Sequence, residues 1–125
     1  MLSELVTLST VGATTDTTMQ IPANSLVLGV TVRVTTGITG IDSTALQFGD
    51  STTAARFGTI AAFTAGTTGV GLAHLQGGIS TDAAGPIVTS ATAVRLTLSG
   101  GTDNTPSAGA VRVTIHYISL TAPTS

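Results

Sequence analysis

Apolar and polar residues alternate with a period of two along much of the chain, which is typical of strands with one buried face. The clearest run covers residues 25–36. One face of this run carries Leu28, Val30, Val32 and Val34, and the other carries Val27, Gly29, Thr31, Arg33 and Thr35. The run predicts a long strand with an aliphatic face in the core and a mostly polar face outside.

Two later runs, residues 92–99 and 111–120, repeat this pattern. The apolar positions are Val94, Leu96 and Leu98 in the first run, and Val111, Val113, Ile115 and Tyr117 in the second. The phase of the second run then slips, because Ile118 and Leu120 are its next apolar residues. Either a β-bulge near Tyr117 or a terminal segment buried on both faces would explain the slip.

Shorter strands are predicted between turn-forming stretches rich in Gly, Asn, Asp and Ser. These strands cover residues 4–10, 15–20, 45–48, 59–63, 70–75 and 86–90. Roughly eight or nine short strands at this spacing predict an all-β fold, an antiparallel β-sandwich of jelly-roll type. We expect one domain over residues 1–125. The segment 100–109, GGTDNTPSAG, is expected to join the last two long strands as a hairpin loop.

Charge is scarce in this chain. Only 8% of residues are charged, against about 25% in an average soluble domain, and there is no lysine. Threonine contributes 26 residues, so the surface is covered either by hydroxyl groups or by a neighbouring subunit. Low charge favours association, and we therefore expect an obligate oligomer, with a threonine-coated monomer as the alternative. Without cysteine, the chain has neither disulfides nor thiolate metal sites.

Membrane and nucleic-acid partners are not expected. The longest stretch without charged residues, 57–81, is broken by Gly, Thr and His74 and holds no apolar run of the roughly 20 residues that a bilayer requires. The N-terminus lacks the basic flank and apolar run of a secretory signal. The net charge is −2, whereas phosphate contacts need clustered Lys or Arg.

No motif points to catalysis, and we expect a protein without enzymatic activity or a cofactor. The sequence lacks G-x-S-x-G, H-E-x-x-H, a P-loop and paired acids. Its two histidines, His74 and His116, would need a symmetry axis to form a zinc site. His116 is expected to be a polar residue on the outer face of the last strand. Asp103 and Asn104 are expected to form Asx turns rather than a calcium site.

Three arginines form the candidate interface. Arg33, Arg95 and Arg112 each lie within a strong strand, opposite its aliphatic face. Bidentate Arg–carboxylate pairs suit subunit interfaces, and solvated arginines are the alternative. At a threefold axis, acids such as Asp42 or Asp50 would have to separate the arginines of neighbouring copies. His116 completes the candidate interface residues.

Several short motifs follow one another in a distinctive order. They are IPA at 21–23, LGVTVRV at 28–34, ITG at 38–40, FGD at 48–50, RFG at 56–58, VRLT at 94–97, GG at 100–101 and VRVTIHY at 111–117. This order resembles the C-terminal β module of spike and fibre proteins from tailed phages and gene-transfer-agent particles. The resemblance covers residues 21–121 and implies a β domain on the virion surface, often trimeric.

In that family the module follows a long anchoring region, whereas the strand pattern here begins almost at Met1. The leading hypothesis is therefore a capsid decoration (cement) protein. It would be made in the bacterial host cytoplasm, bind the major capsid protein as a homotrimer and stabilise the head. The alternative is a head-spike or tail-fibre module that recognises a host surface glycan through loops 36–42 and 100–109. An enzyme acting on surface polysaccharide ranks last.

Overall fold

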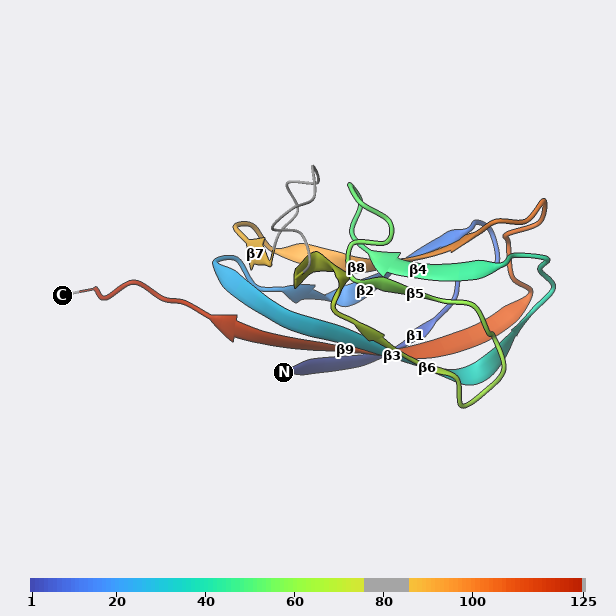
Figure 1. Cartoon of the computed structure of the whole chain (residues 1–125), viewed down its shortest axis with the longest axis horizontal. Coiled ribbons are helices and arrows are strands. Elements are labelled where there is room, and N and C mark those ends of the chain that lie inside the picture. Colours follow the sequence, from blue (N-terminus) through green and yellow to red (C-terminus); the bar gives the residue numbers. More distant parts are fainter. Residues whose placement is uncertain (76–85, 125) are drawn as a thin grey trace.

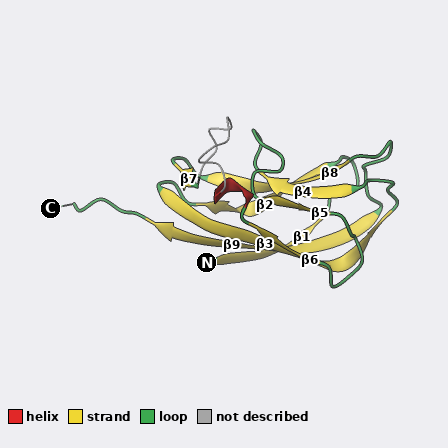
Figure 2. Cartoon of the chain, in the orientation of Figure 1, coloured by secondary structure: helices red, strands yellow, loops and turns green. Residues whose placement is uncertain are grey.

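The protein folds into two antiparallel β-sheets that pack face to face. The structure is a computed structural model, and it describes residues 1–75 and 86–124. The first sheet has the order β1-β9-β3-β6, with β7 also pairing with β3, and the second has the order β2-β8-β4-β5 (Figures 1 and 2). In chain order the strands are β1 (Leu2–Thr7), β2 (Thr14–Ile21), β3 (Ser25–Thr39), β4 (Ala45–Gly49), β5 (Gly58–Ile60), β6 (Thr68–Gly71), β7 (Ile87–Val88), β8 (Thr92–Ser99) and β9 (Ala108–Ser119). The predicted all-β antiparallel sandwich is confirmed.

The core lies between the two sheets and is built from the inward positions of the long strands. Its fully buried members include Val30 and Val34 of β3, Leu96 of β8 and Ile115 of β9. Phe48 and Phe57 are also fully buried, and Phe63 packs against the cluster. The period-2 pattern thus identified the inner face of each long strand.

One part of that pattern was wrong. Leu28 was expected in the core, but it is exposed, while Val27 is fully buried. Val27 pairs with Tyr117 and Gly29 with His116, so β3 carries one extra residue opposite a single step of β9. The bulge expected near Tyr117 therefore lies on the partner strand, and it turns Leu28 to the outer face. Ile118 is also exposed, which contradicts burial on both faces.

The loop after β8 is not the hairpin that was predicted. β8 belongs to the second sheet and β9 to the first, so residues 100–107 cross between the sheets. This loop is held against the residues before β4, because the Asp42 carboxylate accepts bonds from the Thr102 hydroxyl at 2.6 Å and the Asp103 N–H at 2.7 Å. The Asp103 carboxylate accepts the Thr105 N–H, as expected for an Asx turn. This end of the sandwich is therefore closed by a loop that crosses between the sheets.

β6 lies at one edge of the first sheet, and its glycines allow this edge strand to approach the core closely. A Cβ atom at Gly71 would collide with the Phe48 ring, and one at Gly69 would collide with Ile60.

Candidate functional site

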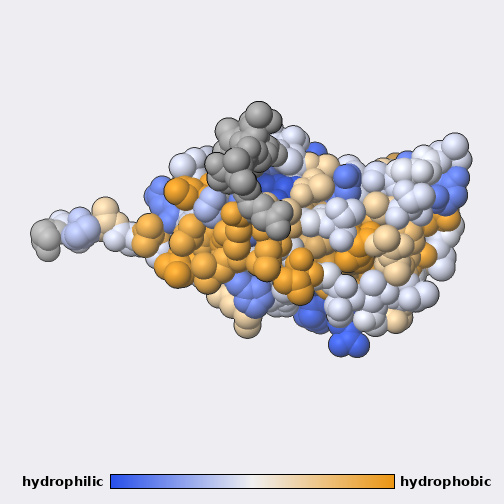
Figure 3. Space-filling view, viewed as in Figure 1, coloured by the Kyte–Doolittle hydropathy of each residue, from blue (hydrophilic) through white to orange (hydrophobic). Residues whose placement is uncertain are grey.

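The outer face of the first sheet carries most of the apolar side chains that the strands leave in contact with solvent. Within the described residues, every large hydrophobic side chain that is exposed and lies in a strand belongs to this sheet. These residues are Leu5, Leu28, Val70, Ile87 and Ile118, with exposed fractions of 50%, 45%, 69%, 65% and 50%. Figure 3 shows hydrophobic side chains gathered toward the end of the molecule from which the C-terminal segment leaves.

The register of the strands explains how these side chains come together. Leu26 of β3 pairs with Ile118 on one side and with Ile87 on the other, so the three form a row across β9, β3 and β7. The Leu72 side chain lies over Gly29, since a Cβ atom there would be 3.1 Å from Leu72 Cδ2. Together with Leu28, these residues form an apolar patch, defined here as Leu26, Leu28, Leu72, Ile87 and Ile118.

Two of the candidate arginines lie farther along the same outer face. Arg33 of β3 and Arg112 of β9 are direct cross-strand partners, and both are exposed. They line one hollow of about 420 Å³ with Val34, Thr35, Ala65 and Gly66. His116 is half-buried and pairs with Gly29, so it lies between the arginines and the apolar patch. Its outer-face position agrees with the sequence prediction.

The third arginine belongs to the other side of the molecule. Arg95 lies on β8 of the second sheet and pairs with Asp16 of β2, its Nε donating to Oδ1 at 2.7 Å and its Nη2 to Oδ2 at 2.9 Å. The bonds from Arg95 lower the pKa of Asp16, and the same pair raises the pKa of Arg95. The structure therefore brings Arg33, Arg112 and His116 onto one face and separates Arg95 from them.

The acids expected between symmetry copies are already engaged within the chain. Asp42 holds the 102–103 loop, and Asp50 forms an ion pair with Arg56, with 2.8 Å between Oδ2 and Nη1. Both acids thus have partners within their own chain, and their placement between the arginines of neighbouring copies stays a prediction. Nothing in the strand pattern signals these bonds, because both acids follow or precede strands in irregular segments.

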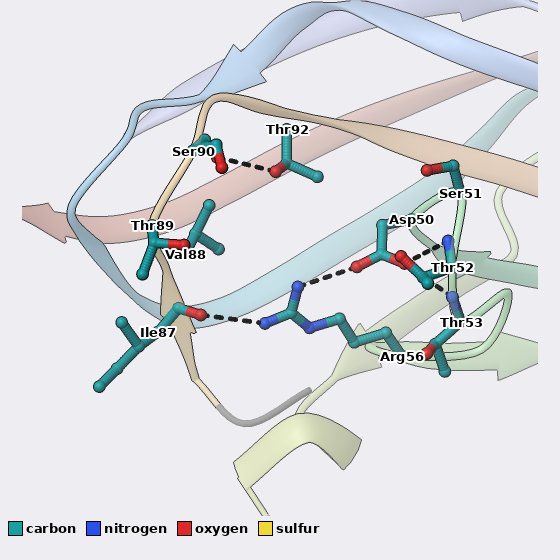
Figure 4. Close-up of a pocket in the computed structure, with 10 residues that line it drawn as sticks. All are labelled: Asp50, Ser51, Thr52, Thr53, Arg56, Ile87, Val88, Thr89, Ser90 and Thr92. Atoms are coloured by element: carbon teal, nitrogen blue, oxygen red, sulfur yellow. Dashed lines mark hydrogen bonds and ion pairs between the residues drawn. The ribbon is translucent and has the colours of Figure 1, made fainter. Parts of the chain in front are cut away.

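The Asp50–Arg56 pair was not identified from the sequence as a structural element, although FGD and RFG both stand out as motifs. The pair lies at the side of an open hollow of about 400 Å³. Serine and threonine side chains of segments 50–53 and 87–92 line this hollow together with Ile87 and Val88 (Figure 4). Asp50 Oδ1 accepts the N–H groups of Thr52 and Thr53, and Arg56 Nη2 donates to the Ile87 carbonyl at 3.3 Å. Burial would raise the pKa of Asp50, but these N–H bonds and Arg56 outweigh it and hold the pKa below its usual value.

His74, whose role the sequence left open, is a core residue. It is buried, its Nε2 lies 2.9 Å from the Val27 carbonyl, and its ring meets Phe57 edge to face. Burial lowers the pKa of His74, so the neutral ring donates to this carbonyl. His74 and His116 thus occupy opposite sides of the first sheet.

Residues suited to a metal centre do not gather in the described ranges, 1–75 and 86–124, where no group of three His, Cys, Asp or Glu side chains comes together. Across the same ranges, no helix has the length and apolar character that crossing a membrane requires.

The comparisons with known proteins give one fold likeness. No protein-family model matches the chain, and neither does any curated protein. Among solved structures, the chain is similar to a chain of "Cyanophage Pam1 capsid asymmetric unit", with 23% sequence identity and a TM-score of 0.54. The likeness covers 92% of this chain and 79% of that chain. The chain therefore shares its two-sheet fold with a protein chain from that phage capsid structure.

Proposed function

We propose that this chain is a structural, non-enzymatic protein of a phage-type particle, a decoration protein that binds the outside of the capsid and stabilises it. The observation that carries the proposal is the shared fold with a chain of a cyanophage capsid structure, over 92% of this chain. The motif order of the spike and fibre modules supports the same class of particle-surface protein.

The proposed oligomer is a homotrimer in which a neighbouring copy covers the apolar patch. The patch and Val70 expose large aliphatic side chains on one face, while only 8% of the chain is charged. Exposed apolar patches of this kind mark interaction surfaces in soluble proteins. A heterologous contact repeated about a threefold axis closes into a ring and removes the patch from water.

The stabilising mechanism is mass action. A protein that binds the assembled shell and not its separated subunits lowers the free energy of the assembled state in proportion to the occupied sites. The proposed partner is the major capsid protein, and the proposed location is the virion surface after synthesis in the host cytoplasm.

The test compares particles that carry the protein with particles produced without it. We expect the stripped particles to break at a lower temperature and a milder osmotic shock, and added protein to restore both thresholds. Identical thresholds for the two preparations would refute the stabilising role.

A second candidate is a glycan-binding head-spike or tail-fibre module. One observation favours it: the loop after β8 and the segment before β4 form one hydrogen-bonded unit around Asp42, which presents Thr102 and Asp103 at an exposed end of the sandwich. Rigid loops on a β-sandwich commonly carry recognition. Binding of the purified protein to defined glycans on an array, or inhibition of phage adsorption by it, would favour this candidate over decoration.

A further inference from the structure

The four cationic side chains of the chain are arginines, and they fall into two groups by their contacts. Arg56 and Arg95 each hold an acid of the same chain at 2.7 to 2.8 Å. Arg33 and Arg112 instead face one another across β3 and β9, and no acid among the described residues pairs with either. Like charges directly opposite each other destabilise a sheet, so the fold places these two arginines together at a cost in stability.

A second copy of the chain has few acids to offer this pair. Asp16 and Asp50 are held by arginines, and Asp42 by the 102–103 loop. The Glu4 carboxylate accepts three bonds from Thr18 and Met19. Asp103 accepts the Thr105 N–H, and Asp82 lies outside the described residues. Each acid among the described residues thus already has a partner in its own chain, which favours a different protein over a second copy as the source of an acid for Arg33 and Arg112.

The shape of the site indicates what part of a partner it accepts. Arg33 and Arg112 line the same hollow of about 420 Å³, whose other walls are small or apolar, including Ala65 and Gly66. Leu5, the cross-strand neighbour of Arg112, and Val70 extend this apolar surround. A guanidinium presents a planar fork of N–H groups that matches the two oxygens of a carboxylate.

We propose that the hollow between Arg33 and Arg112 binds an Asp or Glu side chain of the capsid protein, which both guanidinium groups hold. The inference rests on the proposed decoration function and adds to it the contact face and the chemistry of the contact. The outer face of the first sheet then turns toward the shell at its arginine end, while the apolar patch remains available to a neighbouring copy.

The experiment measures binding of the full chain to particles of its own phage produced without it, over a range of salt concentrations. The variant Arg33→Gln with Arg112→Gln removes both charges, and Arg33→Lys with Arg112→Lys keeps the charges but removes the planar forks. Arg95→Gln is the matched control on the other sheet. Because Arg33 and Arg112 are exposed and their side chains pair with nothing in the described chain, the variants should fold, and circular dichroism checks this.

We expect the double Gln variant to bind at least about tenfold more weakly and to lose most of the salt dependence. The affinity of the double Lys variant should lie between those of the unchanged chain and the double Gln variant. Arg95→Gln should bind as tightly as the unchanged chain does. Equal binding by the double Gln variant would overturn the inference and leave the decoration function intact. A double Gln variant that loses its trimer instead would assign the site to a second copy and also overturn it. Failure of the unchanged chain to bind the particles would remove the decoration function and this inference together.

Discussion

The outer faces of the two sheets differ in whether their charged and apolar side chains find partners within the same chain. On the second sheet the exposed ion pair Arg95–Asp16 lies within the chain, and small or polar side chains surround it. On the first sheet Leu28, Ile118 and their neighbours contact solvent, and Arg33 lies beside Arg112. The ion pair of the second face therefore lies within one chain, whereas the first face exposes apolar area and positive charge that are available to other molecules.

This difference separates the two kinds of energy that a substitution can change. A residue whose partners are all in the chain affects the free energy of unfolding when it is replaced. A residue whose partners belong to another molecule affects the free energy of association when it is replaced, and it barely changes the free energy of unfolding. Substitutions on the two sides of the sandwich should therefore give opposite outcomes in the two measurements.

The largest effect is expected on association. Leu28→Asp places an unpaired charge in the patch that a second copy would cover, which should weaken self-association by about a hundredfold or more. Gln47→Asp on the outer face of β4 is the control and should leave the oligomer unchanged. Sedimentation velocity over a range of protein concentrations measures both. An unchanged chain that stays monomeric at high concentration would contradict the proposed trimer.

The next effect is on folding and concerns the two ion pairs. Asp50→Ala leaves Arg56 without this carboxylate at a site where both side chains are under 10% exposed, and should lower the free energy of unfolding by about 3–5 kcal/mol. Asp16→Ala removes an exposed pair and should cost about 0.5 kcal/mol. Urea unfolding measures the difference, and equal losses would show that burial does not distinguish the two pairs.

The same pair predicts a response to acid. Because the pKa of Asp50 is lower in the folded chain than its ordinary value of 3.8, the unfolded chain binds its proton first as the pH falls. The stabilisation is complete above pH 3.8 and is lost as the pH falls through the folded pKa. Asp50→Ala should therefore unfold with a weaker pH dependence in this range than the unchanged chain.

His74 gives a smaller pH dependence at a higher pH. Its pKa is lowered by burial from an ordinary value of 6.5, so the unfolded chain takes up a proton that the folded chain resists. Stability is complete above pH 6.5 and declines as the pH falls below that value. His74→Asn, which retains an N–H donor for the Val27 carbonyl but does not titrate, should flatten the curve between about pH 7 and 5. If the free energy of unfolding of this variant changes with pH as steeply as that of the unchanged chain, His74 is not the source of the pH dependence.

The smallest expected effect is a gain in stability on the first face. Arg33→Thr removes a like charge from the position opposite Arg112, and should raise the free energy of unfolding by a few tenths of a kcal/mol. Arg95→Thr should lower it by a similar amount, because this arginine is paired. Salt near 1 M should remove most of both changes. A gain from Arg33→Thr that is independent of salt would trace to the strand preference of threonine instead.

The positions of the long strands followed closely from the sequence, whereas the short strands predicted at 59–63 and 70–75 end earlier, at Ile60 and Gly71. The run at residues 92–99 has the same bounds as β8, and the inward positions of β3 from Val30 onward are buried as the alternation predicted. Alternation reports each strand separately, so the pattern contains no information on which strands pair. For that reason the sequence placed Arg95 with Arg33 and Arg112, and read the crossing loop at 100–109 as a hairpin.

The sequence by itself determined that this chain is a β protein with an aliphatic core and almost no charge, because both follow from residue types and their spacing. Only the tertiary structure decided that Leu28 faces outward, that Arg33 lies opposite Arg112, and that Asp50 forms an ion pair with Arg56. Register, a single bulged residue and loop crossings set these contacts, and each depends on which distant segments pack together.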